Sequence, residues 1–111
     1  RDYLDRAVVV SLMVPCEEGA WKAILPLEEE TEADGVELNF GCPHGMAERG
    51  MGSAVGQVPD YVKMVAHWVK ETTRMPCIVK LMPSIADICQ PSLAAINGGA
   101  DAVSLIIRLH L

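Results

Sequence analysis

The sequence predicts an α/β fold: about four consecutive βα units with parallel strands, forming part of an eight-stranded (β/α)8 TIM barrel. Four short segments alternate Val-x-Leu-x, which is the period of a strand, and they cover residues 10–13, 36–39, 79–82 and 103–106. Stretches of helical periodicity and of typical βα length separate them. This alternation indicates a parallel sheet with right-handed crossovers.

The polar positions of the strands distinguish a barrel from a doubly wound sheet. Val and Leu share one face, which helices are expected to cover, and the other face carries Ser11, Glu37, Asn39, Lys80 and Ser104. In a doubly wound sheet the charged residues would press against apolar helices, which is costly. Inside a barrel they can pair with each other or meet a ligand. The barrel is therefore favoured.

Three helices are expected between the strands. The first covers residues 17 to about 32, is bent or loosened at Pro26, and has an apolar side of Trp21, Ile24, Leu25 and Leu27. The second covers about 59–73, begins with Pro59 and Asp60, and has an apolar side of Tyr61, Val62, Met64, Val65, Trp68 and Val69. The third starts near 85 or 91 and ends at 97, before Gly98-Gly99.

Composition excludes several classes of protein. Half of the 111 residues are hydrophobic and the net charge is −6, which argues against a nucleic-acid or anionic-membrane partner. No apolar run approaches the ~18 residues of a membrane span, so a cytoplasmic protein is expected. The four widely spaced cysteines match neither a zinc site nor a disulfide framework. No metal site is predicted, and Cys77 is expected in the core.

Four strands are half of an eight-stranded barrel, so residues 1–111 are interpreted as a fragment of a barrel domain. A half barrel exposes two parallel edges, and the isolated chain is expected to associate or aggregate.

The run 39–46 carries the chemistry. Asn39, Cys42 and His44 lie on the loop that leaves a strand, where α/β barrels place their active sites. Cys42 is a candidate acid or nucleophile, and the alternative is a small buried hydrophobe. The loop over about 41–58 is long and glycine-rich. It is interpreted as a flap over a substrate, or otherwise as a surface excursion.

The run Glu-Leu-Asn-Phe-Gly-Cys-Pro-His-Gly-Met at 37–46 closely resembles the flavin-binding barrel of the dihydropyrimidine dehydrogenase family. The resemblance continues through residues 48–52, Gly56-Gln57, 79–81 and 98–101, and so covers nearly the whole chain. Dihydroorotate dehydrogenases share a shorter Asn-x-x-Cys-Pro-Asn run. His44 in place of the last Asn favours the pyrimidine-reducing branch.

The resemblance implies an FMN-binding TIM-barrel domain that reduces uracil or thymine to the 5,6-dihydropyrimidine. Cys42 would be the general acid at C5 of the ring, Asn39 would bind the pyrimidine and the cofactor, and His44 would help hold the substrate loop. Lys80 would contact the FMN isoalloxazine. Electrons would come from NAD(P)H through a partner domain or subunit that holds FAD and iron–sulfur clusters, and the full-length protein is expected to be an oligomer.

Two departures from that family's pattern leave alternatives open. Met82-Pro83-Ser84 stands where Thr-Pro-Asn is usual, and Ile107-Arg108 stands where Asn-Thr would contribute to the substrate pocket. A dihydroorotate dehydrogenase-type oxidation is one alternative. A truncated, non-catalytic half barrel is the other, and as an isolated fragment the chain is expected to be inactive.

Overall fold

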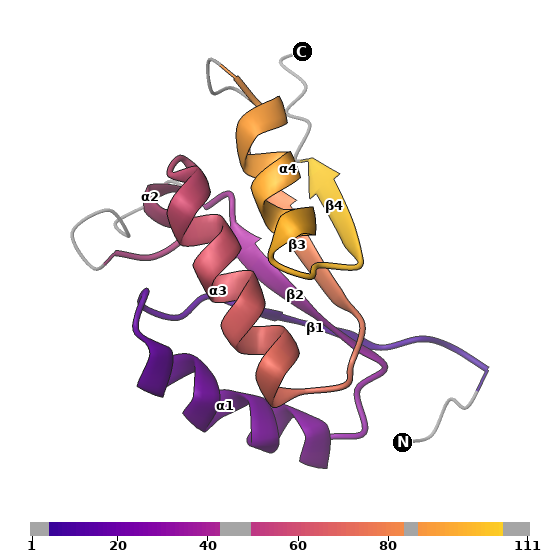
Figure 1. The fold of residues 1–111 in the computed structure, drawn as a ribbon. Helices are drawn as coiled ribbons and strands as arrows, with labels where there is room; N and C mark the ends of the chain where they lie inside the picture. The colour runs from indigo at the N-terminus through magenta and orange to yellow at the C-terminus, as the bar shows by residue number, and fades with distance from the viewer. Residues whose placement is uncertain (1–4, 43–49, 84–86, 106–111) are drawn as a thin grey trace.

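The computed structural model describes residues 5–42, 50–83 and 87–105 (Figure 1). The strands are β1 (Val9–Leu12), β2 (Gly35–Phe40), β3 (Cys77–Leu81) and β4 (Ala102–Leu105). The helices are α1 (Glu18–Glu30), α2 (Ser53–Gly56), α3 (Pro59–Thr72) and α4 (Cys89–Asn97). The four predicted strands are confirmed, each within two residues of the predicted bounds.

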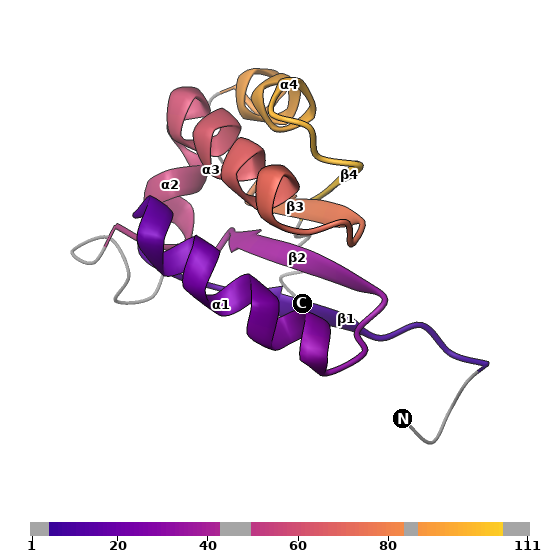
Figure 2. The same cartoon turned by 60° about the horizontal axis from the view of Figure 1, so that its bottom comes forward.

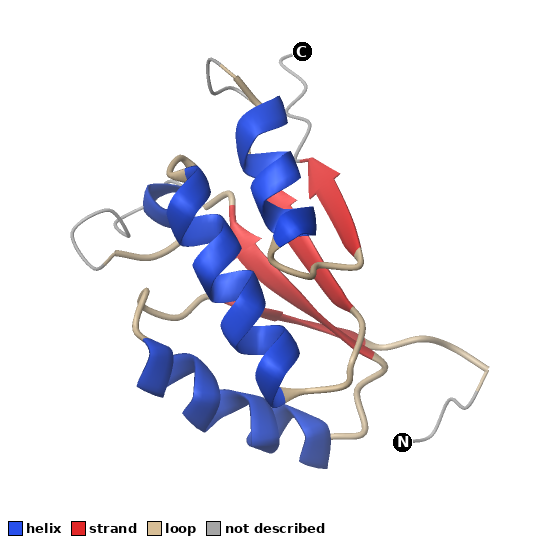
Figure 3. Ribbon diagram, in the orientation of Figure 1, coloured by secondary structure: helices blue, strands red, loops and turns tan. Residues whose placement is uncertain are grey.

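The strands form one parallel sheet in the order β1-β2-β3-β4. When all crossovers have the same hand, an order without reversal puts every helix on the same face. Figures 2 and 3 show α1, α3 and α4 along one side of the sheet, and no described helix covers the other side. A doubly wound sheet would reverse its order and have helices on both faces. The arrangement is that of four consecutive parallel strands of a TIM barrel with the helices that connect them.

The core lies between the sheet and the helices. The Val/Leu face of the central strands β2 and β3 is buried against them as predicted, whereas Leu105 at the end of β4 is 47% exposed. Trp21 of α1 packs edge-on to Phe40, with 6.3 Å between ring centroids, a geometry that stabilises by about 1 kcal/mol beyond area burial. The other large members of the core are Leu25, Val36, Leu38, Val62, Val65, Val69, Val79 and Leu81.

Three residues that were predicted on the apolar sides of the helices are exposed to solvent. Leu27, Tyr61 and Met64 are 59%, 47% and 36% exposed. Consecutive helical residues are turned by about 100°, so Leu27 lies far around α1 from the buried Leu25. The expected loop over 41–58 also contains a short helix, α2, and α4 begins at Cys89. α1 continues through Pro26.

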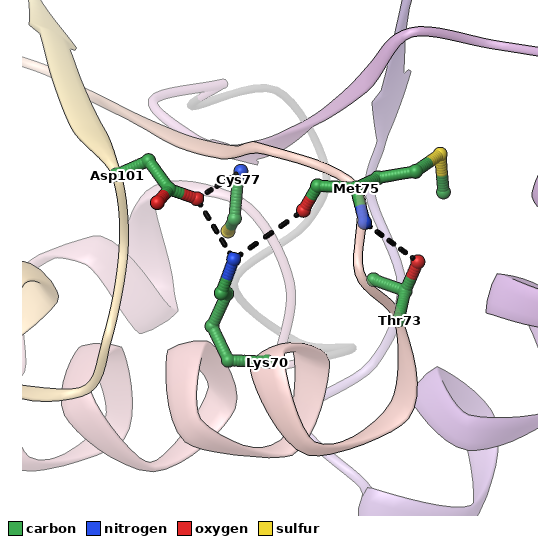
Figure 4. Close-up of polar contacts among 5 residues, drawn as sticks. All are labelled: Lys70, Thr73, Met75, Cys77 and Asp101. Carbon is green, nitrogen blue, oxygen red and sulfur yellow. Dashed lines mark hydrogen bonds and ion pairs between the residues drawn. The ribbon is translucent and has the colours of Figure 1, made fainter.

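A polar network ties α3 to the start of β3 and β4. Lys70 points from α3 toward the sheet (Figure 4) and donates to Asp101 Oδ2 at 2.9 Å and to the Met75 carbonyl at 3.4 Å. Asp101 Oδ2 also accepts the Cys77 N–H. Thr73 accepts the Met75 N–H and donates to Glu29 of α1. These contacts lie at the N-terminal ends of the strands, the end of a barrel that serves stability.

None of the described helices is both long and apolar enough to cross a membrane.

Candidate active site

The C-terminal ends of β2 and β3 bring two predicted site residues side by side. Asn39 of β2 lies directly opposite Lys80 of β3 in the parallel register. Both are partly buried and lie on the face away from the helices, which is the face a barrel turns inward. Cys42 follows β2 and is also partly buried. Asn39, Cys42 and Lys80 thus lie near one another at the C-terminal end of the sheet, and their roles stay predictions.

The Asn39 side chain organises the turn that carries Cys42. Its Oδ1 atom accepts hydrogen bonds from the Gly41 and Cys42 N–H groups, each at 3.2 Å. Such a side-chain-to-backbone turn replaces the strand ladder where the chain leaves the sheet. No described residue accepts a hydrogen bond from the Asn39 amide nitrogen, which is left as a donor.

Helix α2 packs on the same turn from the other side. The Ser53 N–H donates to the Cys42 carbonyl at 3.0 Å. A Cβ on Gly52, which has φ +58°, would lie 2.5 Å from that oxygen, and a Cβ on Gly56 would lie 2.2 Å from the Phe40 carbonyl oxygen. Both glycines are therefore required for α2 to approach the end of β2 (Figure 1).

The loop after β1 reaches the same region. The Cys16 N–H donates to the Gly50 carbonyl at 3.0 Å, which joins the loops that follow β1 and β2. Burial raises the pKa of the Cys16 thiol, so fewer of its molecules are the reactive thiolate at neutral pH. Cys16 is a packing residue of this loop.

A row of polar groups crosses the inward face. Ser11 of β1 donates to Glu37 Oε1 at 2.8 Å, and Lys80 Nζ lies 3.1 Å from the same oxygen. The Lys80 and Glu37 side chains are only 26% and 22% exposed. Ser104 of β4 is opposite Lys80 in the register, and its buried hydroxyl oxygen has no hydrogen-bond partner among the described residues. The row thus includes one charge pair and one unsatisfied hydroxyl.

Of the remaining predicted residues, some lie outside the described part of the chain and others lie within it. His44 and the Ile107-Arg108 departure lie outside the described residues, as do residues 43–49 of the expected flap. Cys77 is fully buried as predicted, and burial raises its pKa to about 12. The sequence indicated Glu37 and Ser11 only as polar positions and missed their contacts with each other. Within the described ranges, no group of three or more His, Cys, Asp or Glu could hold a metal ion.

Comparison with known families identifies the chain. The family model described as dihydrouridine synthase (Dus) matches residues 6–105. The chain belongs to the Dus family.

Two curated relatives of this Dus-family chain are named dihydropyrimidine dehydrogenases. It is 35% identical to the chloroplastic dihydropyrimidine dehydrogenase (NADP(+)) of Arabidopsis thaliana, over 96% of the chain and 25% of the relative. It is 39% identical to the NAD-dependent dihydropyrimidine dehydrogenase subunit PreA of Escherichia coli, over 95% and 25%. The chain spans about a quarter of the length of these relatives. The predicted resemblance to dihydropyrimidine dehydrogenase is confirmed.

One further comparison concerns the dihydroorotate dehydrogenases, and another concerns the fold. The chain is 50% identical to the catalytic subunit of dihydroorotate dehydrogenase B (NAD(+)) from Thermococcus kodakarensis, over 69% of the chain and 24% of the relative. The carboxyl transferase domain of Rhizobium etli pyruvate carboxylase superposes with a TM-score of 0.63 at 16% identity, over 88% of the chain and 16% of that structure. At that identity the likeness concerns only the fold.

The inward face of this Dus-family chain offers hydrogen-bond donors that could hold a ligand bearing carbonyl oxygens, such as a flavin. Lys80 has an ammonium with three donors, one of which faces Glu37. The Asn39 amide nitrogen has no acceptor among the described residues, and the Ser104 hydroxyl is buried and unsatisfied. A buried polar group without a partner is costly, and a ligand with oxygen and nitrogen atoms at its edge would satisfy it.

Proposed function

We propose that this chain supplies part of the active site of a flavin-dependent oxidoreductase that reduces the 5,6 double bond of uracil or thymine. The observation that carries the proposal is the placement of Cys42 and Asn39 at the C-terminal end of β2, beside Lys80 of β3. The names of the family and of its relatives support the substrate class, because dihydrouridine, dihydropyrimidine and dihydroorotate all denote a pyrimidine ring saturated at this bond.

The reduction needs one hydride at C6 and one proton at C5 of the ring. Bound FMN in its reduced form would supply the hydride. Cys42 would give its Sγ proton to C5, leaving a thiolate that takes a proton from solvent before the next turnover. The product would be the 5,6-dihydropyrimidine, which has gained one hydride at C6 and one proton at C5.

Asn39 and Lys80 would hold the reacting groups in place. The Asn39 amide nitrogen would donate to a carbonyl oxygen of the pyrimidine or of the flavin, and Lys80 would donate to the flavin ring. The Lys80–Glu37 ion pair keeps the ammonium on the inward face. His44, two residues after Cys42, would help to hold the substrate loop.

The electrons would reach the site from NAD(P)H through a partner. We propose a domain or subunit of the cytoplasm that carries FAD and iron–sulfur clusters, and an oligomeric full-length protein. The name of the Escherichia coli relative, an NAD-dependent enzyme subunit, supports a separate electron-donating partner. The acidic net charge of −6 favours a free base over a nucleic acid as substrate.

Oxidation of dihydroorotate is the second candidate function. The 50% identity to a dihydroorotate dehydrogenase B catalytic subunit favours it, although that match covers fewer residues than the dihydropyrimidine dehydrogenase matches. In this direction Cys42 would accept a proton from C5 as a thiolate, and the flavin would be reduced.

The test compares both reactions in the complete protein with its electron-donating partner. We expect uracil-dependent oxidation of NADH or NADPH and no reduction of the flavin by dihydroorotate. A Cys42→Ser variant should lose turnover by a factor of about 100 or more while it retains FMN. A Cys89→Ser variant is the matched control, because Cys89 is an exposed thiol on α4. Uracil reduction at the original rate by Cys42→Ser would exclude Cys42 as the acid.

A further inference from the structure

We infer that Asn39 is a positioning residue for Cys42, whose turn is clamped between the Asn39 side chain and helix α2. The inference rests on the proposed function only in taking Cys42 as the proton donor. It assigns to Asn39, Gly52 and Gly56 a role that is separate from ligand binding.

The hydrogen bonds fix the orientation of the Asn39 amide. The Gly41 and Cys42 N–H groups are donors, so the atom they share must be the amide oxygen. The amide nitrogen has two donors, and none of the residues that the structure describes accepts from it. Asn39 therefore has two separable functions: its oxygen holds the turn, and its nitrogen is available to donate to a ligand atom.

The backbone on both sides of Cys42 is held. Its N–H is bound by Asn39, and its carbonyl is bound by the Ser53 N–H at 3.0 Å. Gly56 of α2 packs directly against Phe40 at the end of β2, since a Cβ on Gly56 would lie 2.2 Å from the Phe40 carbonyl oxygen and 2.9 Å from the Phe40 Cβ. A side chain at Gly52 or at Gly56 would push α2 away from the end of β2. The position of the Cys42 thiol relative to the sheet therefore depends on these contacts.

Substitutions at Asn39 separate the two functions. Asn39→Asp keeps an oxygen that can accept from both N–H groups and removes the amide donor, whereas Asn39→Ala removes both. We expect Asn39→Ala to speed hydrogen exchange at the Gly41 and Cys42 amides by about tenfold, the equivalent of one net hydrogen bond. Asn39→Asp should leave both exchange rates within about twofold of the parent protein. Equal acceleration in the two variants would overturn the inference.

The kinetic readout in the complete protein follows the same division. With uracil, Asn39→Asp should mainly raise KM through the lost donor, and Asn39→Ala should also lower kcat because the acid is displaced. A lower kcat in Asn39→Asp that equals the loss in Asn39→Ala would contradict a positioning role. If the protein reduces no pyrimidine, the proposed function fails, while the exchange rates still decide whether Asn39 holds the turn.

Helix α2 provides an independent test with a matched control. Gly56→Ala should increase the rate of iodoacetamide alkylation at Cys42 and lower kcat by about tenfold with little change in KM. Gly98→Ala also creates a severe clash, since its Cβ would lie 2.5 Å from the Lys63 carbonyl oxygen. Gly98 lies between α3 and α4, away from Cys42. Gly98→Ala should lower stability and leave Cys42 alkylation and kcat unchanged. If Gly56→Ala also left the Cys42 alkylation rate and kcat unchanged, α2 would not position the thiol.

Discussion

Lys80 Nζ lies 3.1 Å from Glu37 Oε1, although the strand register places Lys80 opposite Asn39 and Glu37 opposite Ile78. The two residues occupy diagonal positions on one face, and the long lysine side chain spans the difference. Ser11 donates to the same carboxylate oxygen from the neighbouring strand. Three strands are thus connected across the inward face by a single carboxylate.

The Glu37–Lys80 pair should be energetically coupled. We expect a double-mutant cycle of Glu37→Gln and Lys80→Met in urea unfolding to give a coupling free energy of about 1 kcal/mol, because both groups are mostly shielded from solvent. The exposed Lys22–Glu18 pair of α1 is the control. Its coupling should be smaller and should vanish at high salt. Equal coupling for the two pairs would show that the inward face behaves as ordinary surface.

The charge of Lys80 should also affect a bound flavin. Because Glu37 partly neutralises Lys80, we expect Glu37→Gln to raise the midpoint potential of the bound flavin by about 30 mV, which is ~1.4 kcal/mol for a two-electron couple. Lys80→Met should lower the potential. Spectroelectrochemical titration of the complete flavoprotein measures both shifts, and Glu18→Gln on α1 should cause none. Shifts of the same sign in Glu37→Gln and Lys80→Met would contradict the proposed contact.

The strands were predictable because their alternation reflects burial on one face only. Val36 and Leu38 are fully buried, and Glu37 between them is not. Helix α2 was missed because it is four residues long and has no helical period to detect. It forms because Gly52 and Gly56 allow close approach to β2, which is a tertiary requirement. The sequence shows two glycines four residues apart, but it does not show that they pack against the end of β2.

The candidate site was predictable by residue and less so by contact. Asn39 and Cys42 stood out because they follow an apolar strand, and strand ends carry the chemistry of α/β barrels. The bonds from the Gly41 and Cys42 N–H groups to Asn39 were not foreseen, although an Asn side chain commonly accepts from the backbone N–H two residues further on. That the charged residues of this face can pair was expected, but the diagonal geometry was not, because the register places Lys80 opposite Asn39 rather than opposite Glu37.

Asp101 should make stability depend on pH. Its pKa is lowered in the folded protein, first by the hydrogen bond from Lys70 and then by the Cys77 N–H. A depressed pKa contributes stability above the unfolded pKa of about 3.9, and the contribution is lost as the pH falls through the folded value. Asp101→Asn should therefore be destabilising at pH 7, and its difference from the parent should shrink below about pH 4. Urea unfolding at pH 7 and pH 3 measures this.

Lys70→Met provides the cross-check for this prediction. It removes the same ion pair, so its destabilisation should overlap with that of Asp101→Asn, and the double variant should lose less than the sum. Additive losses would show that Lys70 and Asp101 act on separate parts of the structure.

Cys77 should be chemically silent until the protein unfolds. Burial raises its pKa to about 12; the nearby Lys70 charge opposes this shift, and Asp101 adds a smaller contribution that raises the pKa. At pH 8 only about one molecule in 10,000 would carry the thiolate, which is the form that reacts with iodoacetamide. The exposed Cys89 should be modified within minutes, and peptide mass spectrometry of timed samples distinguishes the two sites. Urea above the unfolding midpoint should remove the difference, because it abolishes the burial that raises the pKa of Cys77. Native-state modification of Cys77 at the rate of Cys89 would mean that the start of β3 opens readily and that the Lys70–Asp101 network does not hold it.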